Sequence, residues 1–211
     1  MTEKNREPLS SLVLYHFLKW SLIAPVFHTY YRGRIYRAEN IPQNGSFIIV
    51  SNHASNLDPP LIGIAVRRPI AFMAKEELFR TPGFKQLITA CGAYPVKRNS
   101  SDRSALKSAI KYLNDGWLAG IFLQGTRTDN GKIDDPKLGA ALIAAKTQSP
   151  LIPASIWGTE KEQPSSSILP HAITIRFGEP IPYPESTKKA QLQAVTDKCT
   201  DVINKMHDLG R

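Results

Sequence analysis

Cysteine is scarce in this sequence. Only Cys91 and Cys199 occur among 211 residues, and they are far apart, without the close spacing of metal-binding cysteines. This scarcity excludes a disulfide framework and a cysteine-based metal centre, and it favours a reducing compartment. We expect both thiols to be packing residues. No other residue spacing suggests a metal or a nucleotide, so we predict that the protein uses no cofactor.

A long uninterrupted apolar run is also missing. The most apolar stretch, residues 10–34, is interrupted by His16 and Lys19, whereas a transmembrane helix needs roughly 20 apolar residues. It also lacks the small-residue cleavage site of a secretory signal. The stretch predicts either an interfacial helix on a membrane surface or a helix packed on the protein core. An interfacial helix would have an apolar face of Leu14, Phe17, Leu18, Ser21, Leu22 and Pro25, headgroup aromatics Trp20, Tyr30 and Tyr31, and lipid-facing cations Lys19, Arg32 and Arg34.

Acidic residues are outnumbered by basic ones. The chain has 27 Lys and Arg against 18 Asp and Glu, a formal net charge of +9. This excess favours anionic partners such as phosphate esters, nucleic acid or an acidic membrane surface. Nucleic-acid binders usually cluster basic residues with stacking aromatics along one element, but here the basic residues are spread through the chain. The spread favours an enzyme, and we predict no nucleic-acid partner.

The hydrophobic residues suffice for one core. They make up 42% of the chain, enough for a single domain. Short apolar runs alternate with helical patterns, which predicts an α/β fold with a largely parallel or mixed sheet and helices on both faces. The expected strands are 47–51, 93–96, 120–123, 151–156 and 173–177, the expected helices are 60–66, 102–113, 138–146 and 187–206, and a long surface loop is expected over 161–170.

A histidine and an aspartate follow the first expected strand, in FIIVSNHASNLDPPLIG (47–63). His53 and Asp58 are five positions apart, so they would not share a face of a helix and can cooperate only across a turn. Pro59 disfavours the α conformation at Asp58 and favours a helix starting at the prolines. Asp58 can then be a helix N-cap. Alternatively, it holds the His53 imidazole in one tautomer, so that the other ring nitrogen takes a proton from a substrate hydroxyl.

Two further segments offer phosphate ligands at the ends of expected strands, where α/β sheets bind ligands. Lys97 and Arg98 follow the second strand and can bind a phosphate beside a helix N-terminus, or simply form a solvated edge. Gly125 and Arg127 follow the third strand. Gly125 permits an unusual backbone angle and Arg127 offers a planar fork that matches phosphate oxygens, although a polar turn is the alternative.

Together these segments resemble the glycerolipid acyltransferase family, most closely the 1-acylglycerol-3-phosphate acyltransferases. The blocks of that family are NHx4D, a glycine followed by a short strand and a basic residue, FPEGTR, and an apolar strand with a proline. All four occur here in the same order and with similar spacing, between about residues 34 and 178. They correspond to Asn52, His53 and Asp58; to Gly92 through Lys97 and Arg98; to Phe122, Leu123, Gln124, Gly125, Thr126 and Arg127; and to Ile152 and Pro153.

The resemblance implies a glycerolipid-acyltransferase-like α/β domain over residues 35–211, preceded by a membrane-interface helical segment over residues 1–34. It implies a peripheral or monotopic protein at the cytoplasmic face of a membrane. The implied reaction moves a fatty acyl group from acyl-CoA or acyl carrier protein to the free hydroxyl of lysophosphatidic acid, giving phosphatidic acid. His53 would be the general base, oriented by Asp58, and no enzyme nucleophile would be needed.

The resemblance also implies a phosphate site. Arg127 would hold the acceptor phosphate together with Lys97 or Arg98, and Lys137 is a further candidate because it opens a helix beside a glycine. Backbone N–H groups of the turn at Gly125 would stabilise the tetrahedral oxyanion.

Two residues depart from the FPEGTR block. Leu123 replaces a proline, and Gln124 replaces a glutamate, which removes a charge, keeps a hydrogen-bonding oxygen and adds an NH2 donor. If Gln124 lies beside Arg127, it holds that guanidinium less firmly than a carboxylate would. Two alternatives therefore stay open: an acyltransferase for another lyso-lipid acceptor, and a non-catalytic basic protein that binds lipid.

Overall fold

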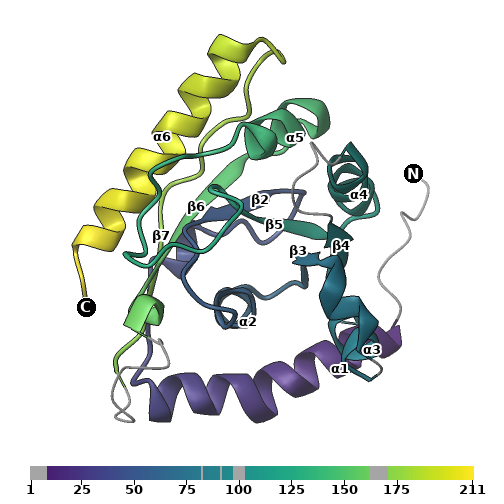
Figure 1. The fold of residues 1–211 in the computed structure, drawn as a ribbon, viewed down its shortest axis with the longest axis vertical. Coiled ribbons are helices and arrows are strands. Elements are labelled where there is room, and N and C mark those ends of the chain that lie inside the picture. Colours follow the sequence, from purple (N-terminus) through teal and green to yellow (C-terminus); the bar gives the residue numbers. More distant parts are fainter. Residues whose placement is uncertain (1–8, 82, 91, 97–102, 162–170) are drawn as a thin grey trace.

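A seven-stranded sheet covered by helices on both faces forms the centre of the described structure (Figure 1). The structure, a computed structural model, describes residues 9–81, 83–90, 92–96, 103–161 and 171–211. The strand order is β1-β7-β6-β2-β5-β3-β4. Neighbouring strands are parallel except β6 and β7, which pair antiparallel. The predicted α/β fold with a largely parallel sheet is confirmed.

The element bounds follow the sequence pattern closely in the centre of the sheet. The strands are β1 (Arg34–Tyr36), β2 (Ile48–Ser51), β3 (Ile70–Lys75), β4 (Tyr94–Val96), β5 (Leu118–Phe122), β6 (Leu151–Trp157) and β7 (Thr174–Phe177). The α-helices are α1 (Leu9–Leu18), α2 (Asp58–Ala65), α3 (Phe84–Ala90), α4 (Arg103–Asn114), α5 (Gly139–Thr147) and α6 (Lys189–Asp208). Short helical turns are η1 (Lys19–Ile23), η2 (Val26–Tyr30), η3 (Ala38–Asn40), η4 (Glu76–Arg80) and η5 (Thr159–Lys161).

Alternate side chains of β2 pack in two separate hydrophobic cores, as expected for a strand buried on both faces. Ile49 packs in one core with α2 and the N-terminal helical segment. Ile48 and Val50 pack in the other with α4, α5 and α6. All three side chains are fully buried. This burial on both faces fixes β2 at the centre of the sheet.

The N-terminal helical segment, α1 with η1 and η2, lies along the face that α2 covers (Figure 1). A Cβ on Gly63 of α2 would lie 2.9 Å from the Tyr15 hydroxyl, so the helices approach closely there. Lys19 is buried and donates from Nζ to the Val66 carbonyl, 2.5 Å away, just after α2. The prediction that Lys19 faces lipid is therefore wrong, because its ammonium instead satisfies a carbonyl at the end of α2.

One side of this segment packs on the core, as the second interpretation predicts, and the other side is exposed. Its inward side chains Ala24 and Phe27 are buried in the core, whereas Phe17 and Trp20 are 63% and 60% exposed. Among the described residues, no helix is long and apolar enough to cross a membrane.

Candidate active site

The site lies where the chain leaves β2 and β5 in opposite directions. These strands are neighbours and parallel, but the segment after β2 leads to α2 on one face of the sheet, whereas the segment after β5 leads to α5 on the other. In α/β proteins, ligands bind outside the carboxyl ends of such strands. His53 follows β2 and the FLQGTR block begins at the end of β5, so both lie at this edge of the sheet.

His53 and Asp58 contact each other across the turn before α2. The His53 Nδ1–H group donates to Asp58 Oδ2 at 2.7 Å, because an ionised carboxylate can only accept. The same oxygen accepts the N–H groups of Ala54 at 2.7 Å and Ser55 at 2.9 Å. Asp58 is completely buried and begins α2, but its side-chain hydrogen bonds go to residues that precede that helix. It therefore orients the histidine rather than capping α2.

The opposite ring nitrogen, Nε2, is left to accept a proton. No described residue hydrogen-bonds to it, and the His53 side chain is 12% exposed. The imidazole stacks on Phe122, with ring centroids 3.9 Å apart and 12° between the planes. Stacking fixes the ring plane and the Asp58 bond fixes its rotation, so Nε2 points in a defined direction.

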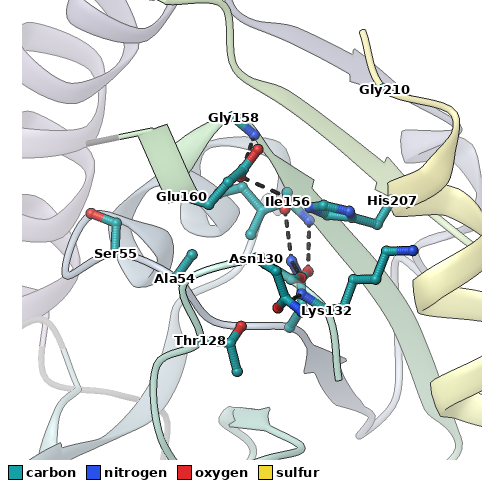
Figure 2. Close-up of polar contacts among 12 residues, drawn as sticks. Ala54, Ser55, Thr128, Asn130, Lys132, Ile156, Gly158, Glu160, His207 and Gly210 are labelled. Atoms are coloured by element: carbon teal, nitrogen blue, oxygen red, sulfur yellow. Dashed lines mark hydrogen bonds and ion pairs between the residues drawn. The ribbon is translucent and has the colours of Figure 1, made fainter. Parts of the chain in front are cut away.

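Asn52 precedes His53 in sequence, and its buried side chain forms several hydrogen bonds inside the protein. Its Nδ2 donates to the carbonyls of Gly131 at 2.7 Å and Ile156 at 2.8 Å, and its Oδ1 accepts the Ile156 N–H at 2.9 Å. Figure 2 shows dashed bonds meeting at Ile156. Asn52 thus ties the end of β2 to β6 and to the 128–133 loop, and sequence reasoning had no signal for partners 79 and 104 positions away.

The FLQGTR block forms a tight turn at the end of β5. The Gly125 N–H donates to the Phe122 carbonyl at 3.0 Å, and Gly125 has a positive φ of 72°, which suits glycine. Gln124 Oε1 accepts the Asp134 N–H at 2.9 Å. Gln124 therefore braces the turn against the following segment. Arg127 is exposed, as is Thr126, and no described carboxylate forms an ion pair with Arg127.

Lys137 comes close to the same turn through its backbone. Its N–H donates to the Leu123 carbonyl at 2.7 Å, while its exposed ammonium pairs with Asp135. The other two predicted phosphate ligands, Lys97 and Arg98, lie outside the described residues. Two predicted cations thus flank the turn: Lys137 pairs with Asp135, whereas Arg127 forms no ion pair with a described side chain.

Pro153 lies within β6, beside Val50 of β2. Its carbonyl accepts the Gly178 N–H at 2.8 Å, and the antiparallel ladder with β7 begins one residue later, at Ala154 and Phe177. Pro153 therefore stands at the boundary between two pairing patterns, where a missing N–H is tolerated. Within the described residues no group of three or more His, Cys, Asp or Glu side chains is placed to hold a metal ion.

Comparison with known proteins settles the family. The pattern that defines the acyltransferase family matches residues 32–157, which contain His53, Asp58 and the FLQGTR turn. The chain belongs to the acyltransferase family. This acyltransferase is 31% identical over 183 residues to the 1-acyl-sn-glycerol-3-phosphate acyltransferase of Bacillus subtilis (strain 168), covering 83% of this chain and 88% of that one.

Two other relatives extend the comparison. The chloroplastic 1-acyl-sn-glycerol-3-phosphate acyltransferase BAT2 of Brassica napus is 31% identical over 79% of this chain, which spans 50% of that longer protein. The crystal structure of the 1-acyl-sn-glycerophosphate (LPA) acyltransferase PlsC from Thermotoga maritima has a TM-score of 0.69 at 25% identity, covering 95% of this acyltransferase and 98% of that chain. The family and fold predicted from the four blocks are confirmed.

Proposed function

We propose that this acyltransferase is a 1-acyl-sn-glycerol-3-phosphate acyltransferase. It moves a fatty acyl group from a thioester carrier, acyl-CoA or acyl carrier protein, to the free hydroxyl of lysophosphatidic acid, and the product is phosphatidic acid. The observation that carries this proposal is the 2.7 Å bond between His53 Nδ1 and Asp58 Oδ2, which leaves Nε2 to act at the carboxyl edge of the sheet. The Bacillus relative, which the chain matches over most of its length, carries the same name.

The chemistry needs one base and no enzyme nucleophile. Nε2 of His53 accepts the proton of the acceptor hydroxyl while its oxygen attacks the thioester carbonyl carbon. The tetrahedral intermediate then expels the carrier thiolate, which takes the proton back from Nε2. Buried Asp58 stabilises the imidazolium formed between these steps, because its charge lies 2.7 Å from Nδ1 in a poorly solvated site.

Arg127 is the proposed ligand of the acceptor phosphate. It is exposed beside the turn that follows β5, and its guanidinium is not consumed by an ion pair with a described side chain. A planar fork can bind two phosphate oxygens at once. Lys137, and Lys97 or Arg98, remain proposed as helpers. The turn at Gly125 is the proposed source of backbone N–H groups for the oxyanion.

We also propose that the protein binds an anionic membrane as a peripheral protein of the cytoplasmic face. An exposed N-terminal apolar surface supports this: Val13, Leu14, Phe17, Trp20, Leu22, Val26 and Tyr30 are all at least 36% exposed. Basic residues Arg32 and Arg34 are exposed at its end. Both the acceptor and the product are membrane lipids, so docking at the membrane surface brings His53 close to the acceptor. Residues 1–34 are thus proposed as a membrane-interface segment and 35–211 as the catalytic domain.

The test is acyl transfer by purified protein to a panel of lyso-lipids from both carriers. We expect lysophosphatidic acid to be the preferred acceptor, and His53→Ala to lower kcat by about 10²- to 10⁴-fold, the usual worth of a general base. Asp58→Asn should also be severe. An asparagine oxygen can still accept the N–H groups of Ala54 and Ser55, so the melting temperature of the Asp58→Asn protein should differ little from that of wild type. A folded His53→Ala protein with a near-normal rate would refute the mechanism, and preference for another lyso-lipid would change the acceptor.

A further inference from the structure

The last turns of α6 form hydrogen bonds and an ion pair with the loop of residues 128–133, which follows the FLQGTR turn. Asn204 of α6 makes a two-sided contact with Ile133: its Oδ1 accepts the Ile133 N–H at 3.0 Å and its Nδ2 donates to the Ile133 carbonyl at 2.9 Å. Next to it, Lys132 forms an ion pair with Asp208 at 2.6 Å. The loop is therefore attached to α6 by its backbone and not only by packing.

The half-buried Glu160 and the buried His207 support the middle of the same loop. Glu160 Oε2 accepts the Gly158 N–H at 2.8 Å and lies 3.8 Å from Nε2 of buried His207 (Figure 2). A Cβ on Gly131 would lie 2.6 Å from His207 Nε2 and 3.4 Å from Glu160 Oε2, and Gly131 also has a positive φ of 69°. The loop therefore rests directly against this pair, at a position that suits only glycine.

The opposite side of the loop holds the catalytic segment. The Gly131 carbonyl accepts Nδ2 of Asn52 at 2.7 Å. The Thr128 N–H donates to the His53 carbonyl at 2.9 Å, and the Thr128 hydroxyl lies 3.3 Å from the same oxygen. The loop is thus fastened to α6 on one side and to the backbone of the catalytic histidine on the other.

We propose that Asn204 and His207 of α6, together with Glu160, are positioning residues that set the placement of His53 through the 128–133 loop. This inference rests on the proposed function of His53 as the base. All three residues lie beyond position 157, where the family match ends, so the four blocks do not contain them. A base displaced by about 1 Å can lose about 10²-fold in rate, which makes a backbone tether to His53 significant for kcat.

The first test compares Asn204→Ala with Thr200→Ala. Both side chains are half-buried and polar on α6, but the Thr200 hydroxyl donates only to the Thr196 carbonyl within the helix. We expect Asn204→Ala to lower kcat about tenfold while the KM for lysophosphatidic acid and for the acyl carrier changes less than about twofold. Thr200→Ala should keep the wild-type kcat. The inference fails if the two variants have the same kcat, or if the loss follows only the fraction of unfolded protein.

The second test does not depend on turnover. The ¹⁵N signals of the histidine rings report the His53 Nδ1 bond to Asp58, and His53→Gln identifies which signals belong to that ring. We expect these signals to shift or broaden in Asn204→Ala and in Gly131→Ala, whose new Cβ would press on His207, and to stay in place in Thr200→Ala. Unchanged His53 signals in both loop variants would overturn the positioning role. If wild type transfers no acyl group to lysophosphatidic acid, the proposed function fails, and these spectra still decide the positioning.

Discussion

The Asp58 side chain makes its hydrogen bonds through one oxygen. Oδ2 accepts three N–H groups, from the His53 ring and from the backbone of Ala54 and Ser55, whereas buried Oδ1 has no hydrogen-bond partner among the described residues. The two backbone donors hold the carboxylate in place before the substrate arrives, so the imidazolium meets a preorganised charge. The resemblance to the NHx4D block predicted the pairing of His53 with Asp58, whereas their spacing alone left an N-cap role for Asp58 open. The backbone donors could not be predicted, because they depend on the conformation of the turn.

Arg127 gives a prediction about the acceptor alone. A lysine at this position keeps the charge but loses the bidentate fork, so Arg127→Lys should raise the KM for lysophosphatidic acid about tenfold and leave the KM for the acyl carrier nearly unchanged. Steady-state kinetics with each substrate varied in turn measures both. Arg67→Lys is the matched control, since Arg67 is also exposed but precedes β3 at the opposite end of the sheet. Equal losses for both substrates would instead assign Arg127 to transition-state binding or to folding.

Gln124 gives a prediction about the departure from FPEGTR. Its Oε1 accepts the Asp134 N–H at 2.9 Å, and a glutamate oxygen there would make a bond roughly twice as strong, because the acceptor is charged. The added charge would also compete with a phosphate for exposed Arg127. Gln124→Glu should therefore change acceptor KM more than donor KM, in an enzyme that is active as it stands. An inactive wild type that Gln124→Glu makes active would mark a disabled acyltransferase and favour the lipid-binding alternative.

At the scale of elements, five of the seven described strands were predicted from apolar runs, including the edge strand β4, whereas β1 and β3 were not. β2, β6 and β7 coincide within about one residue with apolar runs, because a strand buried on both faces has a nearly continuous apolar sequence. β1 was missed because it is three residues long with only Ile35 partly buried. β3 was missed although IAFMA is apolar, and α3 was missed as well. Alanine and methionine favour helix as much as strand, so such runs are ambiguous until pairing partners are known.

The candidate site was likewise only partly predictable from the sequence. The four blocks predicted which side chains act, but not the contacts that hold those side chains in place. Asn52 is bonded to Gly131 and Ile156, and Phe122 carries the His53 ring. These contacts join β2, β5, β6 and a loop, and no local pattern encodes a contact between segments brought together only by folding.

The N-terminal apolar surface gives a prediction about membrane binding. Phe17→Ser together with Trp20→Ser should weaken binding to vesicles of anionic lipid at least about tenfold, since each side chain contributes about 1.5–3 kcal/mol when buried in an apolar phase. Melting should hardly change because both side chains are exposed. Vesicle co-sedimentation measures the binding. Leu209→Ser is the matched control, because Leu209 is 68% exposed but follows α6.

The salt dependence of vesicle binding separates the electrostatic contribution from the apolar contribution. Raised salt should weaken binding of the wild type to anionic vesicles, because attraction of surface charges is screened beyond about 10 Å at 0.1 M. Binding that is insensitive both to salt and to the double substitution would restrict the N-terminal segment to packing on α2.

On the scale of the whole molecule, α2 connects the N-terminal helical segment to the turn that holds His53. Its first residue is Asp58, which orients His53, and the carbonyl of Val66 just after its last turn accepts the Lys19 ammonium at 2.5 Å. A charged side chain is thus buried between the N-terminal segment and α2. Burial disfavours the charged form and lowers the pKa of Lys19 from 10.5 to about 8.

This lowered pKa predicts how the stability of the molecule changes with pH. Below pH 8 Lys19 is protonated in both the folded and the unfolded chain, so its contribution is constant. Between about pH 8 and pH 10 the folded chain releases the proton while the unfolded chain still holds it, and the free energy of unfolding must rise with pH, by at most about 1.4 kcal/mol per pH unit.

Denaturant unfolding measured from pH 7 to 9.5 should show this rise in wild type, and Lys19→Met should lack it. Lys146→Met, which removes an exposed lysine of α5, should keep the wild-type pH dependence. Parallel curves for wild type and Lys19→Met would mean that the ammonium is solvated, and that the N-terminal segment does not pack on α2 as closely as the bond to Val66 requires.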